Sequence, residues 1–241
     1  MHYSAPPIIG GVETVIRAHT ELLLAAGHRV TILAGRGRAF DRRAPVQRIA
    51  LIDSTSPEIL AINEELAHGI VSERFTRAEA AIRKELKHYL ENTDILIAHN
   101  VLSLHKNLPL TAALWHLRND GVHTPLIAWC HDLAWTSSQY LPVLHEREPW
   151  TLLKKAIPGA RYVTVSDDRA HQLAELWGAS TSAVTVVPNG VDAAALVRLS
   201  PVARRLASRL RLWEQDLVLL LPARMTRRKN IELAIRITAS L

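Results

Sequence analysis

Short apolar runs that alternate with amphipathic helical segments constrain the fold of this chain more than any other feature. Near-continuous apolar runs of this length are typical of strands buried on both faces of a sheet. They lie at residues 95–98, 126–129, 162–165 and 184–187. Helical patterns separate them at 109–118, 146–155 and 167–177. Because strands that alternate with helices build parallel sheets, we predict an α/β fold with a doubly wound parallel sheet.

The N-terminal part continues this alternation. The expected elements are a helix from Val12 to Ala26, strands at 29–34 and 46–52, and a helical region at 59–91 with a break near 72–76. Gly27 follows the first helix, as is typical of a helix end. The residues before Pro6-Pro7 leave room for only a shortened first strand, so we expect the natural start to lie upstream of Met1.

The last quarter of the chain is expected to open a second domain. Pro201 stands where a new helix can start, and an apolar run at 217–221 predicts a strand. We therefore divide the chain into a first domain at 1–188, a linker at 189–200 and the truncated start of a second domain at 201–241.

Composition is that of an ordinary soluble globular protein, with 48% hydrophobic and 22% charged residues. No apolar run approaches the roughly 20 residues that a membrane span needs. The single cysteine, Cys130, rules out an internal disulfide and fits a reducing compartment, so we expect a cytoplasmic protein. The net charge of +6 favours anionic partners, and an arginine cluster at 36–48 suits peripheral contact with the anionic inner face of a membrane.

Nucleic-acid binding and metal binding are disfavoured. The basic clusters lack interleaved aromatic residues for base stacking, and aromatic residues make up 5% of the chain. The 12 histidines include no His-Glu-x-x-His run, and neither paired cysteines nor an Asp-x-Asp pattern occurs. We predict no nucleic-acid partner, no metal site and no cofactor.

The loop that follows 217–221 carries cations directly before a new helix. These are Arg224, Arg227, Arg228 and Lys229. Cations together with the free backbone N–H groups of a strand-to-helix turn make a pocket for phosphate. The loop therefore predicts a phosphorylated small-molecule ligand.

Paired glycines, Gly10 and Gly11, lie between the first strand and the first helix. Glycines let the backbone come close to a ligand, and the helix N-terminus behind them offers N–H donors to an anion. An ordinary strand-to-helix turn explains the pair equally well. The G-x-G-x-x-G dinucleotide spacing is absent.

His131 directly follows the apolar run at 126–129 and Cys130. The carboxyl ends of such strands are where doubly wound folds bind ligands, and a histidine there can donate to a hydroxyl or stabilise developing charge. The alternative is a histidine that only caps the strand end. We favour the functional role, and we expect Cys130 to be a buried, inert thiol.

Taken in order, these landmarks resemble family 4 glycosyltransferases. The resemblance covers essentially the whole chain and rests on the following residues: Gly10-Gly11-Val12-Glu13, Ala25-Ala26-Gly27-His28, His131, Ser166, Pro188-Asn189-Gly190-Val191-Asp192, Arg224 and Lys229. It implies the GT-B architecture of two Rossmann-like domains that face each other across a cleft. It also implies transfer of a sugar from a nucleotide-diphosphate sugar to a sugar, lipid or small-molecule acceptor, with retention of anomeric configuration and usually without a metal.

The resemblance also assigns roles to residues. Arg224 and Lys229 would neutralise the donor diphosphate as it leaves, and Gly10 and Gly11 would approach the same diphosphate from the opposite domain. His131 would contact the transferred sugar near the reacting centre. The last two candidates, Asn189 and Gly190, would help to line the cleft where the chain crosses between domains.

One departure from the family's pattern leaves two readings open. The Glu-x₇-Glu element that grips the sugar and ribose in the family's second domain is missing, because the chain ends too early. The chain is then either part of a retaining glycosyltransferase, with a second chain as one possible source of the rest, or a non-catalytic, partner-binding Rossmann-like domain. A basic nucleic-acid-binding protein is a third and less favoured reading.

Overall fold

The computed structural model describes residues 1–191, 200–224 and 226–240, which form two units, 1–189 and 190–241. Most of the predicted linker, at 192–199, lies outside the described residues.

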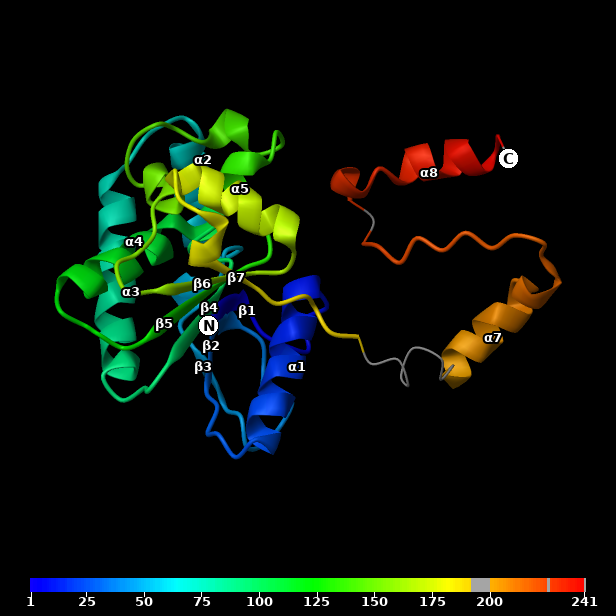
Figure 1. Ribbon diagram of the computed structural model, residues 1–241, viewed down its shortest axis with the longest axis horizontal. Coiled ribbons are helices and arrows are strands. Elements are labelled where there is room, and N and C mark those ends of the chain that lie inside the picture. Colours follow the sequence, from blue (N-terminus) through cyan, green and yellow to red (C-terminus); the bar gives the residue numbers. More distant parts are fainter. Residues whose placement is uncertain (192–199, 225, 241) are drawn as a thin grey trace. The chain divides into compact units, whose positions relative to one another are not determined.

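The strands of the first unit form two parallel sheets (Figure 1). One has the order β1-β2-β3, with strands His2–Ser4, Ile32–Arg36 and Val46–Arg48. The other has the order β4-β5-β6-β7, with strands Leu96–His99, Leu126–Cys130, Arg161–Thr164 and Val184–Val186.

Two hydrogen bonds between backbone groups join these sheets at β1 and β4. The amino group of Met1 donates to the Ile97 carbonyl at 2.6 Å, and the His99 N–H donates to the Met1 carbonyl at 2.9 Å. This is the slanted pattern of neighbouring parallel strands. The strands therefore follow the order β3-β2-β1-β4-β5-β6-β7. All are parallel, but successive strands are added on one side of β1 up to β3 and on its other side from β4 onwards. This change of side is the topological switch point of a doubly wound fold, so the predicted fold class is confirmed.

Five α-helices connect the strands of the first unit (Figure 1). They are α1 (Gly11–Ala25), α2 (Pro57–Ala67), α3 (Glu73–Leu90), α4 (Leu108–Asn119) and α5 (Asp167–Trp177). Polar side chains cap four of them by accepting a backbone N–H of the first turn: Ser56, Ser72, Asn107 and Ser166. The cap at Ser72 explains the predicted break in the helical region 59–91. Short 3₁₀ turns are Ala50–Ile52, His105–Asn107, Ala134–Thr136, Leu141–Val143, Trp150–Lys154 and Thr181–Ala183.

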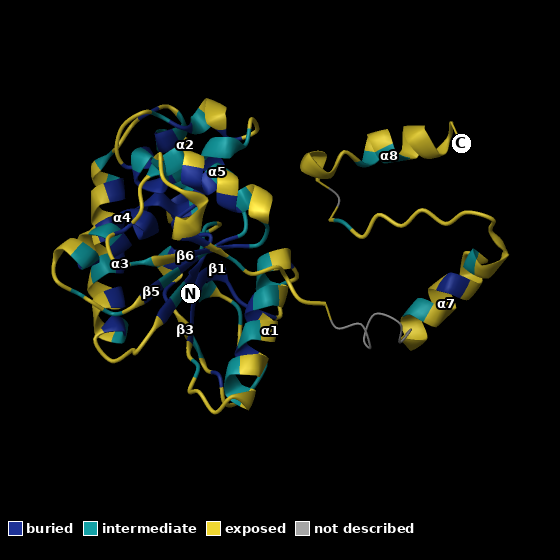
Figure 2. Cartoon of the chain, viewed as in Figure 1, coloured by how far each residue is buried: buried dark blue, intermediate teal, exposed yellow. Residues whose placement is uncertain are grey.

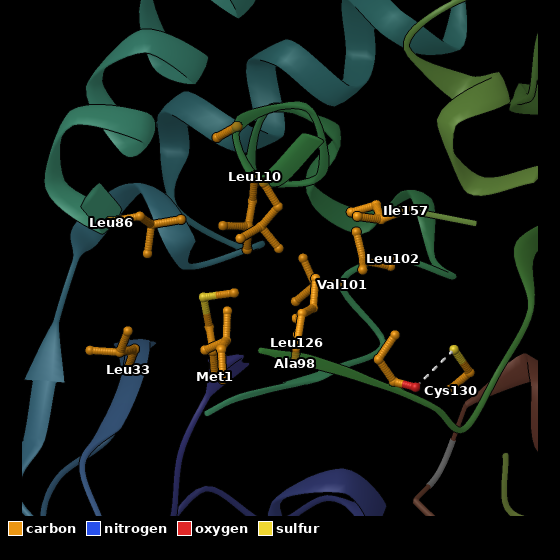
Figure 3. Close-up of a cluster of buried hydrophobic side chains, with 14 of the residues drawn as sticks. Met1, Leu33, Leu86, Ala98, Val101, Leu102, Leu110, Leu126, Cys130 and Ile157 are labelled. Atoms are coloured by element: carbon orange, nitrogen blue, oxygen red, sulfur yellow. Dashed lines mark hydrogen bonds between the residues drawn. The ribbon is translucent and has the colours of Figure 1, made fainter. Parts of the chain in front are cut away.

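Side chains that alternate along β2 show that both faces of the sheet are covered. Leu33 belongs to the main buried cluster, which also contains Leu86 of α3 and Leu110 of α4 (Figure 3). Its neighbours Ile32 and Ala34 belong to a separate cluster that includes Ile16 of α1. Since successive strand side chains point to opposite faces, α1 covers one face, and α3 and α4 cover the other.

The predicted helix at 146–155 is wrong. This segment forms only a 3₁₀ turn, Trp150–Lys154. Pro149 lies within it, and a proline lacks an N–H to donate and disfavours helical backbone in the residue before it. The strand predicted at 46–52 is also shorter, because a 3₁₀ turn replaces it after Arg48.

Adjacent residues of α2 provide a test of the buried core. The Ile59 side chain is fully buried, whereas Leu60 is 52% exposed. Ile59→Ala is expected to lower the free energy of unfolding by about 3 kcal/mol, because it removes buried methyl groups and leaves a cavity. Leu60→Ala is expected to change it by less than about 0.5 kcal/mol. Urea denaturation of both variants measures the difference, and equal losses would contradict the placement of α2.

The described residues of the second unit contain helices and turns without a strand. They form α7 (Pro201–Arg209), a turn at Leu212–Glu214, a turn at Arg227–Lys229 and α8 (Ile231–Thr238). The helix expected after Pro201 is confirmed, but the strand predicted at 217–221 is wrong. Its leucines and valine are 45% to 82% exposed (Figure 2). An apolar run becomes a strand only when a neighbouring strand takes up its hydrogen bonds, and the described part of this unit offers none.

Candidate functional site

The carboxyl ends of β1 and β4 meet at the switch point, and β5 lies next to β4. The segment after β1 leads through Gly10 into α1. His99 ends β4 and is followed by Asn100, while His131 follows β5. Doubly wound folds bind ligands at this edge of the sheet, where neighbouring connections leave in opposite directions.

The side chain of Asn100 ties the end of β4 to the turn after β5. Its Oδ1 accepts hydrogen bonds from the backbone N–H groups of His131, at 2.7 Å, and Asp132, at 3.1 Å. Its Nδ2 donates to Asp132 Oδ2 at 3.4 Å. Asn100 is buried and has φ of 60°, a left-handed conformation that is uncommon outside glycine.

The ring of His131 is held by the ring of His99. Nδ1 of His99 lies 3.1 Å from Nε2 of His131, and the rings are stacked with centroids 5.4 Å apart. His99 in turn packs against Trp129 and His19, with ring centroids 5.9 Å and 5.5 Å away. The buried His2 binds the His99 carbonyl through Nδ1 at 2.8 Å. His131 is only partly exposed, next to the end of β4.

Burial keeps these histidines neutral. Loss of solvation lowers the pKa of His131 to about 4, despite the opposing effect of Asp132. The pKa of His2 is also lowered to about 4 by burial, and that of His99 falls well below its usual value for the same reason. At neutral pH the His99–His131 pair therefore consists of two neutral imidazoles, which can share one bridging proton.

Glu13 folds back over the first of the paired glycines. Its Oε1 accepts a hydrogen bond from Ser4 Oγ at 2.5 Å, and a Cβ added to Gly10 would lie 2.0 Å from its Oε2. Gly11, the first residue of α1, is open, because a Cβ added there would meet no described atom within 4 Å. His2 interacts electrostatically with both Glu13 and His131. The glycine turn and His131 thus both follow strands of the first unit, β1 and β5.

Cys130 plays no chemical part at this edge. It is buried, its thiol donates to the Ala128 carbonyl at 3.7 Å, and burial raises its pKa to about 12 (Figure 3). A thiol with that pKa carries almost no thiolate at neutral pH and is a poor nucleophile. Nor do the described residues contain a group of three or more His, Cys, Asp or Glu side chains placed to hold a metal ion.

The other predicted site residues lie at the end of the first unit and in the second. Asn189 is the last residue of the first unit, and Gly190 is the first of the second; both are exposed. Arg224 and Lys229 are exposed residues of the second unit. Lys229 ends the 3₁₀ turn Arg227–Lys229, whose successor Asn230 has φ of 45° and leads into α8. The structure thus places Gly10, Gly11 and His131 in the first unit, after the strands β1 and β5, whereas Arg224 and Lys229 lie near each other in sequence before α8 in the second.

The switch-point order defines the first unit as a Rossmann-like domain of the kind found in GT-B enzymes. The family model for Glycosyltransferase Family 4 matches residues 9–195. The chain belongs to this family, which confirms the resemblance, and its function therefore involves a sugar donor and an acceptor. A search of curated proteins found no match.

Sequence reasoning missed Asn100 and treated His99 as one of several scattered histidines. The signal that identified His131 was present for both, because His99 and Asn100 also follow a buried apolar run. Their partners were not visible, since the hydrogen bonds to residues 131 and 132 join positions more than thirty apart in the chain. Only the parallel pairing of β4 with β5 brings these positions together.

Proposed function

We propose that the protein is a retaining glycosyltransferase that moves a sugar from a nucleotide-diphosphate sugar to an acceptor. The observation that carries the proposal is the placement of His131. In a chain of this family, it directly follows β5 at the carboxyl edge of the sheet, one strand away from the switch point between β1 and β4. There it would face the transferred sugar, close to the centre where positive charge develops.

The diphosphate would be bound by the glycine turn and by the basic loop. Gly10 and Gly11 would approach it with backbone N–H groups at the start of α1. Arg224 and Lys229 would neutralise the negative charge that grows on the leaving diphosphate. Two cations at that position can supply the stabilisation that a metal supplies elsewhere, so the proposed transfer needs no metal. Asn189 and Gly190 would line the cleft between the domains.

The remaining partners follow from the family and from charge. The first unit would be the acceptor-side domain, residues 201–241 would belong to the nucleotide-sugar-binding domain, and a second chain is a proposed partner. The acceptor would be a sugar, a lipid or a small molecule. No described helix is long and apolar enough to cross a membrane. We propose a cytoplasmic protein that touches an anionic membrane peripherally through its arginine cluster at 36–48.

A panel of UDP-, GDP- and ADP-sugars tests this function on the full-length protein. We expect the protein to release the nucleoside diphosphate from one of these donors when an acceptor is present. NMR of the product should show the same anomeric configuration as in the donor. A product with the opposite anomeric configuration would exclude the retaining mechanism. No release from any donor, with candidate acceptors supplied, would favour a non-catalytic, partner-binding role.

Gly11 offers a test that separates ligand binding from folding. Gly11→Ala adds a methyl group where no described atom lies within 4 Å, and alanine favours helices more than glycine does. We expect Tm to stay the same or rise slightly, while KM for the donor rises about tenfold, a loss of about 1.4 kcal/mol of binding. Donor titrations and thermal melts measure the two effects, and an unchanged KM would remove Gly11 from the proposed diphosphate site.

A further inference from the structure

We propose that Asn100 is a positioning residue that holds His131 in the geometry needed for ligand contact, with Nδ1 of His131 as the nitrogen left for the ligand. This inference deepens the proposed function and rests on it for its catalytic consequence. The positioning itself is a property of the first unit and can be measured without donor or acceptor.

Every polar group of Asn100 has a partner in a neighbouring strand or turn. Its backbone N–H donates to the Trp129 carbonyl at 2.9 Å, and its carbonyl accepts from the Tyr3 hydroxyl at 3.3 Å. Its side chain binds the N–H groups of His131 and Asp132 and the Asp132 carboxylate. One residue thus connects β1, β5 and the turn that carries His131.

The turn depends on this side chain because two of its backbone donors use the same oxygen. A buried N–H group that loses its partner costs about 1–3 kcal/mol of stability. Without Asn100 Oδ1, we therefore expect the turn to open, so that these N–H groups form hydrogen bonds to water. Opening would move the His131 backbone away from the end of β4. The ring contact with His99 would then lengthen or break, since His99 is itself fixed within β4.

The His99 ring determines which nitrogen of His131 remains available. Nε2 of His131 is engaged with His99 Nδ1 at 3.1 Å, and a bridge between two neutral imidazoles needs one N–H and one lone pair. If His99 donates, Nδ1 of His131 carries the other proton and can donate to a ligand hydroxyl. If His131 donates, its Nδ1 is an acceptor. In both arrangements Nδ1 is the nitrogen that a ligand can reach.

A purely conformational role for Asn100 predicts a different outcome. Asparagine tolerates the left-handed backbone, and φ of 60° could by itself explain its presence. Glycine accepts that backbone with less strain but lacks the side chain. Aspartate keeps an acceptor oxygen in the same place, and its second oxygen can share a proton with the Asp132 carboxylate that the Asn100 amide faces. Asn100→Gly and Asn100→Asp therefore separate the two explanations.

The test measures amide hydrogen exchange at His131 and Asp132, the pKa of His131 by NMR, and transfer kinetics of the full-length protein. Asn100→Gly is expected to abolish protection of both amides and to raise the pKa of His131 towards 6.5 as water enters. We expect kcat to fall about 10–100-fold, as is usual when a supporting hydrogen bond is lost. Asn100→Asp should keep both amides protected.

Asn107 provides the matched control. It is fully buried, it caps α4, and its Nδ2 donates to the Leu51 carbonyl at 2.8 Å. Asn107→Gly should lower Tm but leave the exchange of residues 131 and 132 and the pKa of His131 unchanged. Wild-type exchange, pKa and kcat in Asn100→Gly would overturn the proposal. Lost protection in a protein that transfers no sugar from any donor would refute the function and leave the positioning intact.

Discussion

Arg224→Ala and Lys229→Ala are each expected to lower kcat for sugar transfer by about 10²–10³-fold in the full-length protein. This is the usual cost of removing one group that stabilises developing negative charge in a site. The leaving diphosphate gains charge as the bond to the sugar breaks, and the proposed site balances that charge with these two side chains. A loss of this kind falls mainly on kcat, because the charge is greatest in the transition state.

Arg228 is the matched control for both substitutions. It lies in the same exposed 3₁₀ turn as Lys229 and carries the same charge as Arg224. Arg228→Ala changes the net charge of the loop equally, but we expect a loss of less than about threefold, since an exposed surface charge contributes little. Steady-state kinetics with the preferred donor compare the variants. Near-normal turnover in both Arg224→Ala and Lys229→Ala would refute the assigned roles.

The second large effect is a loss of stability in mild acid. Burial holds the pKa of His2, His105 and His131 at about 4, and that of His99 well below its usual value. In the unfolded chain these groups titrate near 6.5. Between those values the unfolded state binds more protons, so the free energy of unfolding must fall as pH falls from about 6.5 to about 4.

His2, His105 and His131 are each expected to cost on the order of 2 kcal/mol across that window, after allowance for partial exposure, and His99 adds to the loss in the same direction. Together they approach the roughly 5–15 kcal/mol that stabilises a typical domain, so we expect the first unit to unfold near pH 5. Urea denaturation at a series of pH values measures the slope. His105→Phe should flatten it, whereas substitution of the exposed His28 should not. A free energy of unfolding that stays constant between pH 6.5 and 4 would contradict the burial of these rings.

The elements predicted best from the sequence are those whose residues all have the same kind of surroundings in the fold. The runs at 126–129 and 162–165 are strands in the middle of a parallel sheet, so both faces are apolar and the pattern is clear. The helix predicted at 167–177 was confirmed with the same bounds, because Ser166 and Gly178 provide a cap at each end.

The wrong predictions arose where the apolar pattern suited a strand or helix but the neighbouring residues did not allow that element to form. At 217–221 the residues suit a strand, but strand formation depends on a partner that the run itself cannot specify. At 146–155 the apolar spacing was helical, yet Pro149 interrupts it. Asn100 was missed for a related reason, since its importance lies in contacts with His131 and Asp132 that only the paired strands create.

The most direct test of the proposed diphosphate site is a structure of the full-length protein with UDP, GDP or ADP bound. We predict that the diphosphate lies at the start of α1, with its oxygens within hydrogen-bond distance, about 2.7–3.2 Å, of the Arg224 guanidinium and the Lys229 ammonium. His131 should face the position of the transferred sugar through Nδ1. A bound nucleotide whose diphosphate is remote from Arg224, or a second unit that packs as an outer layer on the first sheet, would contradict it.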